Sequence, residues 1–199
     1  YLALSASSPF LNGQVTGYHS SRWQMFPKTP QEVPLFTSHG HFVQWTEEQL
    51  TLGTMQNVRH LWSAVRPNGD NRPHNLNRLE LRICDLVTNP LSLLAIVALL
   101  EARLQQMLAD PTLDPLQQSQ LTPSELLTLA DQNEISAAVS SLDSTLHHWR
   151  DGRAIAAREW IEELYQSVQP EAKYQGFACF LPPLRKILRE GNQAQQWLT

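Results

Sequence analysis

The segment 79–85, which reads Leu-Glu-Leu-Arg-Ile-Cys-Asp, constrains what this chain can fold into more than any other stretch. Successive side chains of a β-strand point to opposite faces, so its three aliphatic residues would form one buried face. Glu80, Arg82 and Cys84 would share the other face. A carboxylate suits a hard cation such as magnesium, and an arginine suits phosphate oxygens, so this face is typical of metal–nucleotide chemistry. The alternative is an ion pair on a solvated sheet face.

Composition limits the class of protein. The 199 residues are enough for one well-cored domain, or for one domain with a helical appendage, and 42% of them are hydrophobic. Only 17% are charged, where about a quarter is usual. We therefore expect something outside this sequence to cover part of the surface. A net charge of −4 without a basic stripe argues against nucleic acid as a partner.

Cysteine usage and the absence of targeting signals in the sequence predict a cytoplasmic protein. Two cysteines, Cys84 and Cys179, are too few for a disulfide framework. The longest apolar run, 91–100, is about half of what a membrane span requires, so we expect no membrane partner. The chain begins at Tyr1 as if a strand were already under way, and we expect it to be part of a longer protein.

Periodicity and turn residues predict the elements of the first half. They are a strand at 1–8, a short helix at 18–26, a helix from Thr46 to about Leu52, and a strand at 58–66. The polar loop 67–74 would join this last strand to 79–85 as an antiparallel neighbour.

The second half is mainly helical. Asn89 and Pro90 are a helix start, and the helix at 91–108 is apolar nearly all round, which predicts burial against the sheet. We expect three parts: sheet and helix at 1–109, a polar linker at 110–121, and a helical region at 122–199 packed on the same domain. This last region opens with a capping box at Thr122 and contains a hairpin near 144–156, around a two-residue turn at Asp151 and Gly152.

Two common catalytic classes lack support. No His-Glu-x-x-His or Cys-x-x-Cys motif occurs among the seven histidines and two cysteines, so the sequence does not predict zinc catalysis. No nucleophile-elbow pattern surrounds the serines near the amino terminus.

Three ordered segments resemble one family. Residues 5–10 read Ser-Ala-Ser-Ser-Pro-Phe and lead through Gly13 and Gly17-Tyr18 to Ser20-Ser21-Arg22; residues 65–67 read Val-Arg-Pro; and the third segment is 79–85. Together they are similar to the signatures of the glutamate–cysteine ligases (gamma-glutamylcysteine synthetases) within the carboxylate–amine ligase family. The sequence of these segments is most similar to that of the cyanobacterial type, and the chain as a whole resembles the carboxy-terminal half of such a ligase.

The resemblance implies an α+β fold: a glutamine-synthetase-like, curved and mostly antiparallel sheet with helices on one side, present here as a partial domain, followed by a helical carboxy-terminal region. It also implies that ATP phosphorylates the gamma-carboxylate of glutamate, that the amine of cysteine attacks the acyl phosphate, and that ADP is released, as in the first step of glutathione biosynthesis. Under this scheme Glu80 ligates magnesium and Arg82 holds the transferring phosphoryl group of ATP. Arg22 and Arg66 would bind substrate carboxylate or phosphate, with Arg66 counted with Arg82 among the catalytic residues.

Two departures qualify this expectation. Ala64 stands where many relatives carry a carboxylate, and the family's amino-terminal half, with further metal ligands, is absent from the sequence. We therefore expect that half as a partner, and little turnover by this chain alone. The sequence leaves two alternatives open: a carboxylate–amine ligase with another amine acceptor, and a non-catalytic binding module in which Glu80 and Arg82 form only a structural pair.

Overall fold

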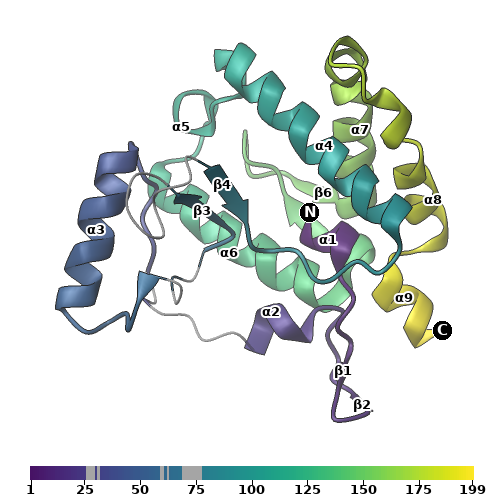
Figure 1. Cartoon of the computed structure of the whole chain (residues 1–199), viewed down its shortest axis with the longest axis horizontal. Helices are drawn as coiled ribbons and strands as arrows, with labels where there is room; N and C mark the ends of the chain where they lie inside the picture. Colours follow the sequence, from purple (N-terminus) through teal and green to yellow (C-terminus); the bar gives the residue numbers. More distant parts are fainter. Residues whose placement is uncertain (26–29, 31, 59–60, 62, 69–77) are drawn as a thin grey trace. The chain divides into compact units, whose positions relative to one another are not determined.

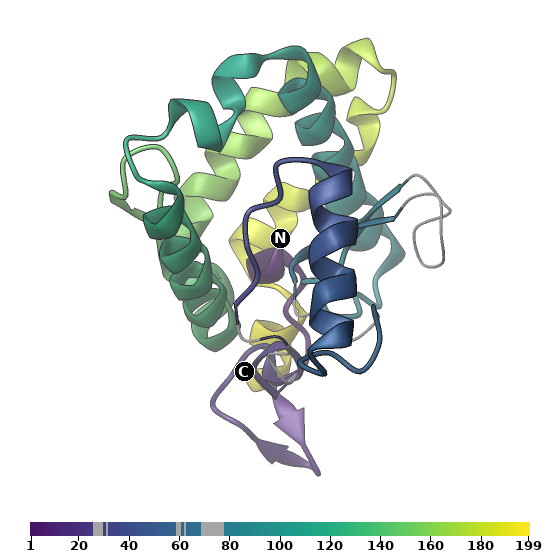
Figure 2. The same cartoon turned by 90° about the vertical axis from the view of Figure 1, so that its left-hand side faces the viewer.

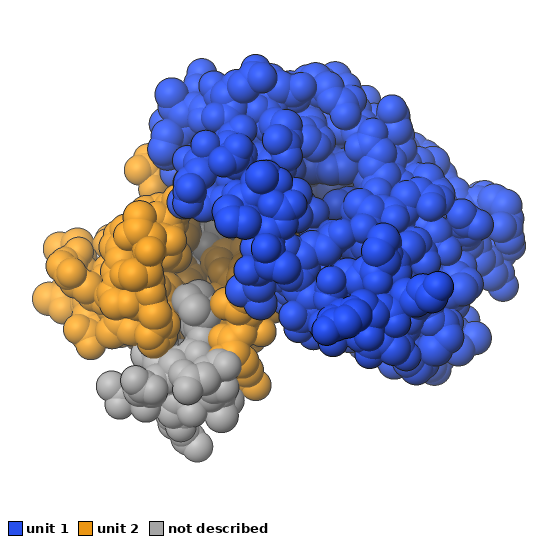
Figure 3. Space-filling view, turned by 90° about the horizontal axis from the view of Figure 1, so that it is seen from above, with its two compact units in different colours: residues 1–24, 85–199 blue, residues 25–84 orange. Residues whose placement is uncertain are grey.

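The computed structural model describes residues 1–25, 30, 32–58, 61, 63–68 and 78–199 (Figure 1). Their contacts define two compact units, coloured separately in Figure 3. Unit 1 contains Tyr1–Gln24 and Asp85–Thr199, and unit 2 contains Met25–Cys84. The boundary at 84/85 cuts through the segment with which the sequence analysis began.

Unit 1 is mostly helical. Its α-helices are α1 (Leu2–Ser5), α2 (Ser21–Met25, ending at the boundary), α4 (Pro90–Ala109), α5 (Pro115–Gln118), α6 (Pro123–Ser140), α7 (Ala157–Tyr174), α8 (Pro183–Glu190) and α9 (Gln193–Leu198). Short 3₁₀ helices are η2 (Pro111–Leu113), η3 (Ser141–Asp143) and η4 (Ala178–Phe180). Helix α4 packs on α7 and α8, and α1 packs on α6 and η3. The small hairpin of β1 (Phe10–Leu11) and β2 (Gln14–Val15) projects from these helices in both side views (Figures 1 and 2).

Helix α4 forms where the sequence predicts a helix, but its surroundings differ from the prediction. The Asn89 side chain accepts hydrogen bonds from the backbone N–H groups of Leu91 and Ser92, which caps the first turn. Its buried residues are Ala95, Ile96, Ala98, Leu99 and Ala102. Val97 on another side of the helix is 51% exposed. The predicted burial all round and against a sheet is therefore wrong for the described residues, where helices cover one face of α4.

By length and composition, α4 is the one helix in the described part of the chain that could cross a membrane. Core helices of soluble proteins pass the same test, so this is weak support for a span.

Residues 2–5 form a helix, and the predicted strand at 1–8 is wrong. The Ser5 N–H donates to the Tyr1 carbonyl at 3.0 Å, and all four residues of α1 are buried. The segment Leu-Ala-Leu-Ser contains no β-branched residue and two leucines and an alanine, which are strong helix formers. Burial on every side therefore favoured a helix over an alternating strand.

Two features of the helical region lie where the sequence predicts them. Thr122 and Glu125 form a reciprocal capping box at the start of α6. Strand β5 (Thr145–His147) pairs antiparallel with β6 (Ala154–Ala156). The connection is longer than the predicted two-residue turn, because the strands end at His147 and resume at Ala154, with Gly152 at a positive φ of 74°.

Unit 2 is built on α3 (His39–Thr51) and a two-stranded sheet. Phe42 of α3 packs with Met55 and Leu61 in its core. The predicted start of this helix at Thr46 is wrong. Thr46 is buried inside the helix and its hydroxyl donates to the Phe42 carbonyl, whereas the Ser38 side chain caps α3 eight residues before Thr46.

Strand β3 (Val65–Asn68) pairs antiparallel with β4 (Arg78–Leu81), as predicted for these neighbours. Both strands are shorter than predicted. The described residues between 58 and 64 are not in a strand, residues 59, 60 and 62 lie outside the described part, and residues 82–85 leave β4. Leu79 is 59% exposed, so the predicted buried aliphatic face is also wrong. A two-stranded ribbon has little structure of its own to cover such a face.

The described strands form three separate two-stranded antiparallel sheets. The glutamine-synthetase-like curved sheet and the domain ranges 1–109, 110–121 and 122–199 stay predictions.

Candidate functional site

The first cluster of charged side chains lies on the β3–β4 pair of unit 2. The register places Arg66 directly opposite Glu80. Side chains directly opposite on antiparallel strands share a face, and here Nη2 of Arg66 lies 2.6 Å from Oε2 of Glu80. The alternative of an ion pair between strands is therefore realised for Glu80, and Arg66 is the nearest partner among the described contacts.

Two further arginines surround the same carboxylate. Nη2 of Arg78 lies 3.8 Å from Oε2 of Glu80, and Nε of Arg82 lies 4.0 Å from Oε1. The backbone N–H of Arg82 donates to the Ala64 carbonyl at 2.7 Å, and its guanidinium donates to the Leu61 carbonyl. The end of β4 thus holds Arg82 against the segment that leads into β3.

Arg66 is the most buried of the three arginines, with its side chain 7% exposed. Its Nη1 donates to the Val58 carbonyl at 3.0 Å, whereas its Nε is buried without a hydrogen-bond partner among the described residues. A buried donor left unpaired costs free energy. In the described contacts three guanidinium groups lie around one carboxylate, and guanidinium groups suit anions such as phosphate.

The same donor set fits magnesium poorly by itself. Glu80 is one carboxylate among three cations, and the described residues contain no group of three or more His, Cys, Asp or Glu side chains that could hold a metal. Magnesium needs six oxygen ligands, several of them from water or substrate phosphates. The described cluster of Arg66, Arg78, Glu80 and Arg82 therefore offers donors that suit an anion better than ligands that suit a metal.

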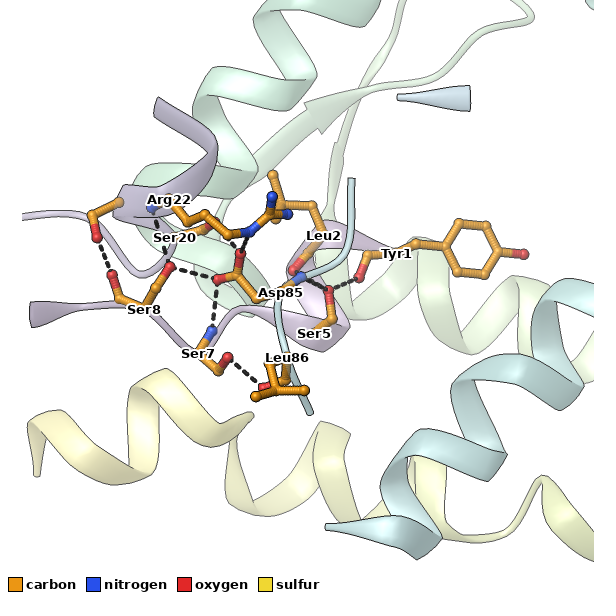
Figure 4. Close-up of polar contacts among 10 residues, drawn as sticks. Tyr1, Leu2, Ser5, Ser7, Ser8, Ser20, Arg22, Asp85 and Leu86 are labelled. Atoms are coloured by element: carbon orange, nitrogen blue, oxygen red, sulfur yellow. Dashed lines mark hydrogen bonds and ion pairs between the residues drawn. The ribbon is translucent and has the colours of Figure 1, made fainter. Parts of the chain in front are cut away.

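The second cluster lies in unit 1 around Asp85, whose side chain is 1% exposed (Figure 4). Its Oδ2 accepts from the backbone N–H of Ser7 at 3.0 Å and from the Ser8 hydroxyl at 2.7 Å. Its Oδ1 accepts from the Ser20 hydroxyl at 3.0 Å and from Nε of Arg22 at 2.9 Å. These charge-assisted hydrogen bonds satisfy a carboxylate that would otherwise be costly to bury.

Backbone hydrogen bonds bring the two serine segments together. The Ser8 N–H donates to the His19 carbonyl at 3.1 Å, and the Ser21 N–H donates to the Ser8 carbonyl at 3.0 Å. The backbone of Asp85 is also held in place, because its N–H donates to the Ser5 hydroxyl at 3.3 Å. The Ser-Ala-Ser-Ser and Ser-Ser-Arg motifs therefore act as donors around one buried carboxylate.

The structure thus gathers three of the four predicted site residues, Arg66, Glu80 and Arg82, in unit 2. It places Arg22 with Asp85 in unit 1, and each cluster is described by itself. Sequence reasoning missed Arg78 and Asp85. The signal for Arg78 was its place two residues before Glu80, on the same strand face; Asp85 stood at the end of the motif without an assigned role.

Each unit thus holds a cluster of arginine and carboxylate side chains, and comparison with known proteins gives the family of the chain. The family model described as "Glutamate-cysteine ligase family 2" matches residues 1–199. The chain belongs to this family, which confirms the resemblance read from the sequence.

Curated relatives agree with this assignment. The chain is 32% identical to "Putative glutamate--cysteine ligase 2" of Sorangium cellulosum over 200 residues, 99% of this chain and 50% of the relative. It is 30% identical to "Putative glutamate--cysteine ligase 2-1" of Frankia casuarinae, covering 96% of this chain and 48% of the relative. It is also 30% identical to "Putative glutamate--cysteine ligase 2" of Mycobacterium tuberculosis, which covers 99% of this chain and 50% of the relative. The chain therefore spans about half the length of these relatives.

Proposed function

We propose that this chain forms part of an ATP-dependent glutamate–cysteine ligase, acting with a partner portion that corresponds to the amino-terminal half of the family's proteins. ATP would transfer its γ-phosphoryl group to the gamma-carboxylate of glutamate, with release of ADP. The amine of cysteine would then attack the acyl carbon and displace phosphate. This is the first step of glutathione biosynthesis, and we place it in the cytoplasm.

The observation that carries the proposal is the arginine cluster of unit 2 in a chain of this family. Transfer of a phosphoryl group spreads negative charge over its oxygens, and fixed cations stabilise that charge. Nε of Arg82 lies 4.0 Å from Oε1 of Glu80, which holds the Arg82 side chain in place. The side chain is 16% exposed, so it also reaches solvent. We assign it to the transferring phosphoryl group, with Arg66 beside it and Arg22 on a substrate carboxylate or phosphate.

Glu80 has two roles in this proposal. In the chain as described it pairs with Arg66 at 2.6 Å and so keeps the arginines together. Phosphate oxygens of ATP would compete for the same guanidinium groups, which would make the carboxylate available as one ligand of a magnesium ion. Bound magnesium would neutralise charge on the phosphoryl oxygens; its other ligands would come from ATP, from water and from the partner portion.

The test is ADP release and dipeptide formation by the protein from the complete reading frame, supplied with ATP, magnesium, glutamate and cysteine. We expect Arg82→Ala to abolish both products and to leave the protein folded. Arg189→Ala, on a side chain that is 69% exposed, is the matched control and should retain activity. Normal turnover by Arg82→Ala would exclude the role given to Arg82.

Replacing cysteine by other amines tests the acceptor. A faster reaction with a different amine would favour the carboxylate–amine ligase alternative. Absence of ADP release with every acceptor would favour the binding module instead.

A further inference from the structure

We infer that one face of helix α4 is the surface on which the partner portion of the protein docks. This outer face of α4 is made up of Leu93, Leu94, Val97 and Leu108. The inference rests on the proposed function, because it takes the portion that corresponds to the amino-terminal half of the family's proteins as the partner. It adds where on this chain that portion binds.

The outer face lies away from the side of α4 that unit 1 buries. Helix α4, drawn in teal in Figure 1, packs on α7 and α8, and its buried residues include Ala95, Leu99 and Ala102. Leu93 and Leu94 lie four and three residues before Val97, and Leu108 lies eleven residues after it. Residues with these spacings share one side of a helix, so the four apolar side chains form a stripe.

This stripe is apolar and yet exposed. Leu94 is 44% exposed, Val97 51% and Leu108 83%. A helix that is apolar nearly all round is normally buried all round, and contiguous apolar surface on a folded protein is typical of an interaction site. The low share of charged residues, 17%, agrees with a surface that another part of the protein covers.

The length of the relatives supplies the occupant. The match covers 50% of the relative from Sorangium cellulosum, so an equal length of that relative lies outside it. Helix α1 packs on α4 and begins at Leu2. A portion joined ahead of Tyr1 would therefore meet unit 1 close to α4.

Two other occupants fit less well. By length and composition α4 passes as a membrane span, but one of its faces is already packed on α7 and α8. A helix lying on a membrane surface carries lysines or arginines beside its apolar face, and α4 contains one basic residue, Arg103, which is partly buried. A second copy of this chain would cover the face but would add none of the length by which the relatives exceed it.

The experiment compares this chain by itself with the protein from the complete reading frame, using hydroxyl-radical oxidation of side chains read by mass spectrometry. We expect Leu93, Leu94 and Val97 to be oxidised in the chain by itself and several times more slowly in the complete protein. Tyr174 on α7, which is 85% exposed, is the internal reference and should react alike in both.

Val97→Asp tests the same face through stability. An aspartate that is covered by apolar surface loses its hydration without gaining a partner. We expect Val97→Asp to lower the melting temperature of the complete protein by several degrees, and that of the chain by itself much less. Ile135→Asp, at a residue of α6 that is 46% exposed, is the matched control and should have similar effects on the two proteins. Should Val97→Asp prevent folding of the complete protein, oxidation of the two unaltered proteins still decides.

The outcomes separate the occupants. Equal oxidation of the outer face in the two unaltered proteins would overturn the inference. Slow oxidation already in the chain by itself would also overturn it, because this chain or a second copy would then cover the face. Protection by phosphatidylglycerol vesicles, without protection in the complete protein, would assign the face to a membrane instead.

Turnover of the same complete protein separates this inference from the proposed function. Dipeptide formation with a fully oxidised outer face would overturn the docking surface alone. A protected outer face without ADP release would overturn the proposed function and leave the docking surface standing.

Discussion

Glu80→Gln is the most informative single change in unit 2, because it removes the charge that holds Arg66. Taking one partner from a buried ion pair costs about 3–5 kcal/mol, whereas exposed pairs contribute at most about 1 kcal/mol. Arg66 is 7% exposed and Glu80 is 33% exposed, so the pair lies between these limits. Glutamine also keeps an acceptor oxygen for Arg66. We expect the opening of β3–β4 to become easier by about 2 kcal/mol.

Hydrogen exchange measured by mass spectrometry reads this effect locally. A change of about 2 kcal/mol corresponds to about 30-fold faster exchange of the backbone amides in β3 and β4. Glu47→Gln makes the same change of charge on an exposed residue of α3 in the same unit, and it should leave these amides unaffected. Equal exchange in the two variants would refute the reasoning, because it would mean that Glu80 does not hold Arg66 in solution.

Three further predictions concern unit 1. Burial lowers the pKa of His19, against a smaller opposing effect of Asp143, so the contribution of His19 to the unfolding free energy should be constant above about pH 6.5 and fall as the pH drops below it. Urea titrations at pH 7.5 and 5.5 should show a smaller loss of unfolding free energy for His19→Gln than for the unaltered chain. The loss that remains is due in part to His148, whose pKa burial also lowers. Leu99→Ala, at a site 1% exposed, should lower the unfolding free energy by about 2–5 kcal/mol in the same titrations. Leu94→Ala, at a site 44% exposed on the same helix, should lower it by less than about 1 kcal/mol. Equal losses in the two variants would contradict the packing of α4. Thr122→Ala should cost about 1 kcal/mol through loss of the capping box, and faster amide exchange in the first turn of α6 is the sign to look for.

Local chemistry explains which elements the sequence predicts well. Asn89 with Pro90, and Thr122 with Glu125, satisfy free backbone donors at helix starts through neighbours only a few residues away, so both caps were found. The errors arose where burial decided the outcome. Residues 2–5 suit a helix or a strand in isolation, and their burial by α6, η3 and α4 selects the helix.

The candidate site shows the same limit in its two clusters. Glu80 and Arg66 were both chosen from short motifs, but their pairing follows from the β3–β4 register, which the sequence predicted only as an antiparallel neighbourhood. Asp85 was quoted within a motif and given no role, because its four donors lie 63 to 78 positions away along the chain. Three of those donors are serine side chains or backbone, which no charge pattern marks. The burial and the hydrogen bonds of Asp85 therefore follow from the tertiary structure, which the motif alone does not show.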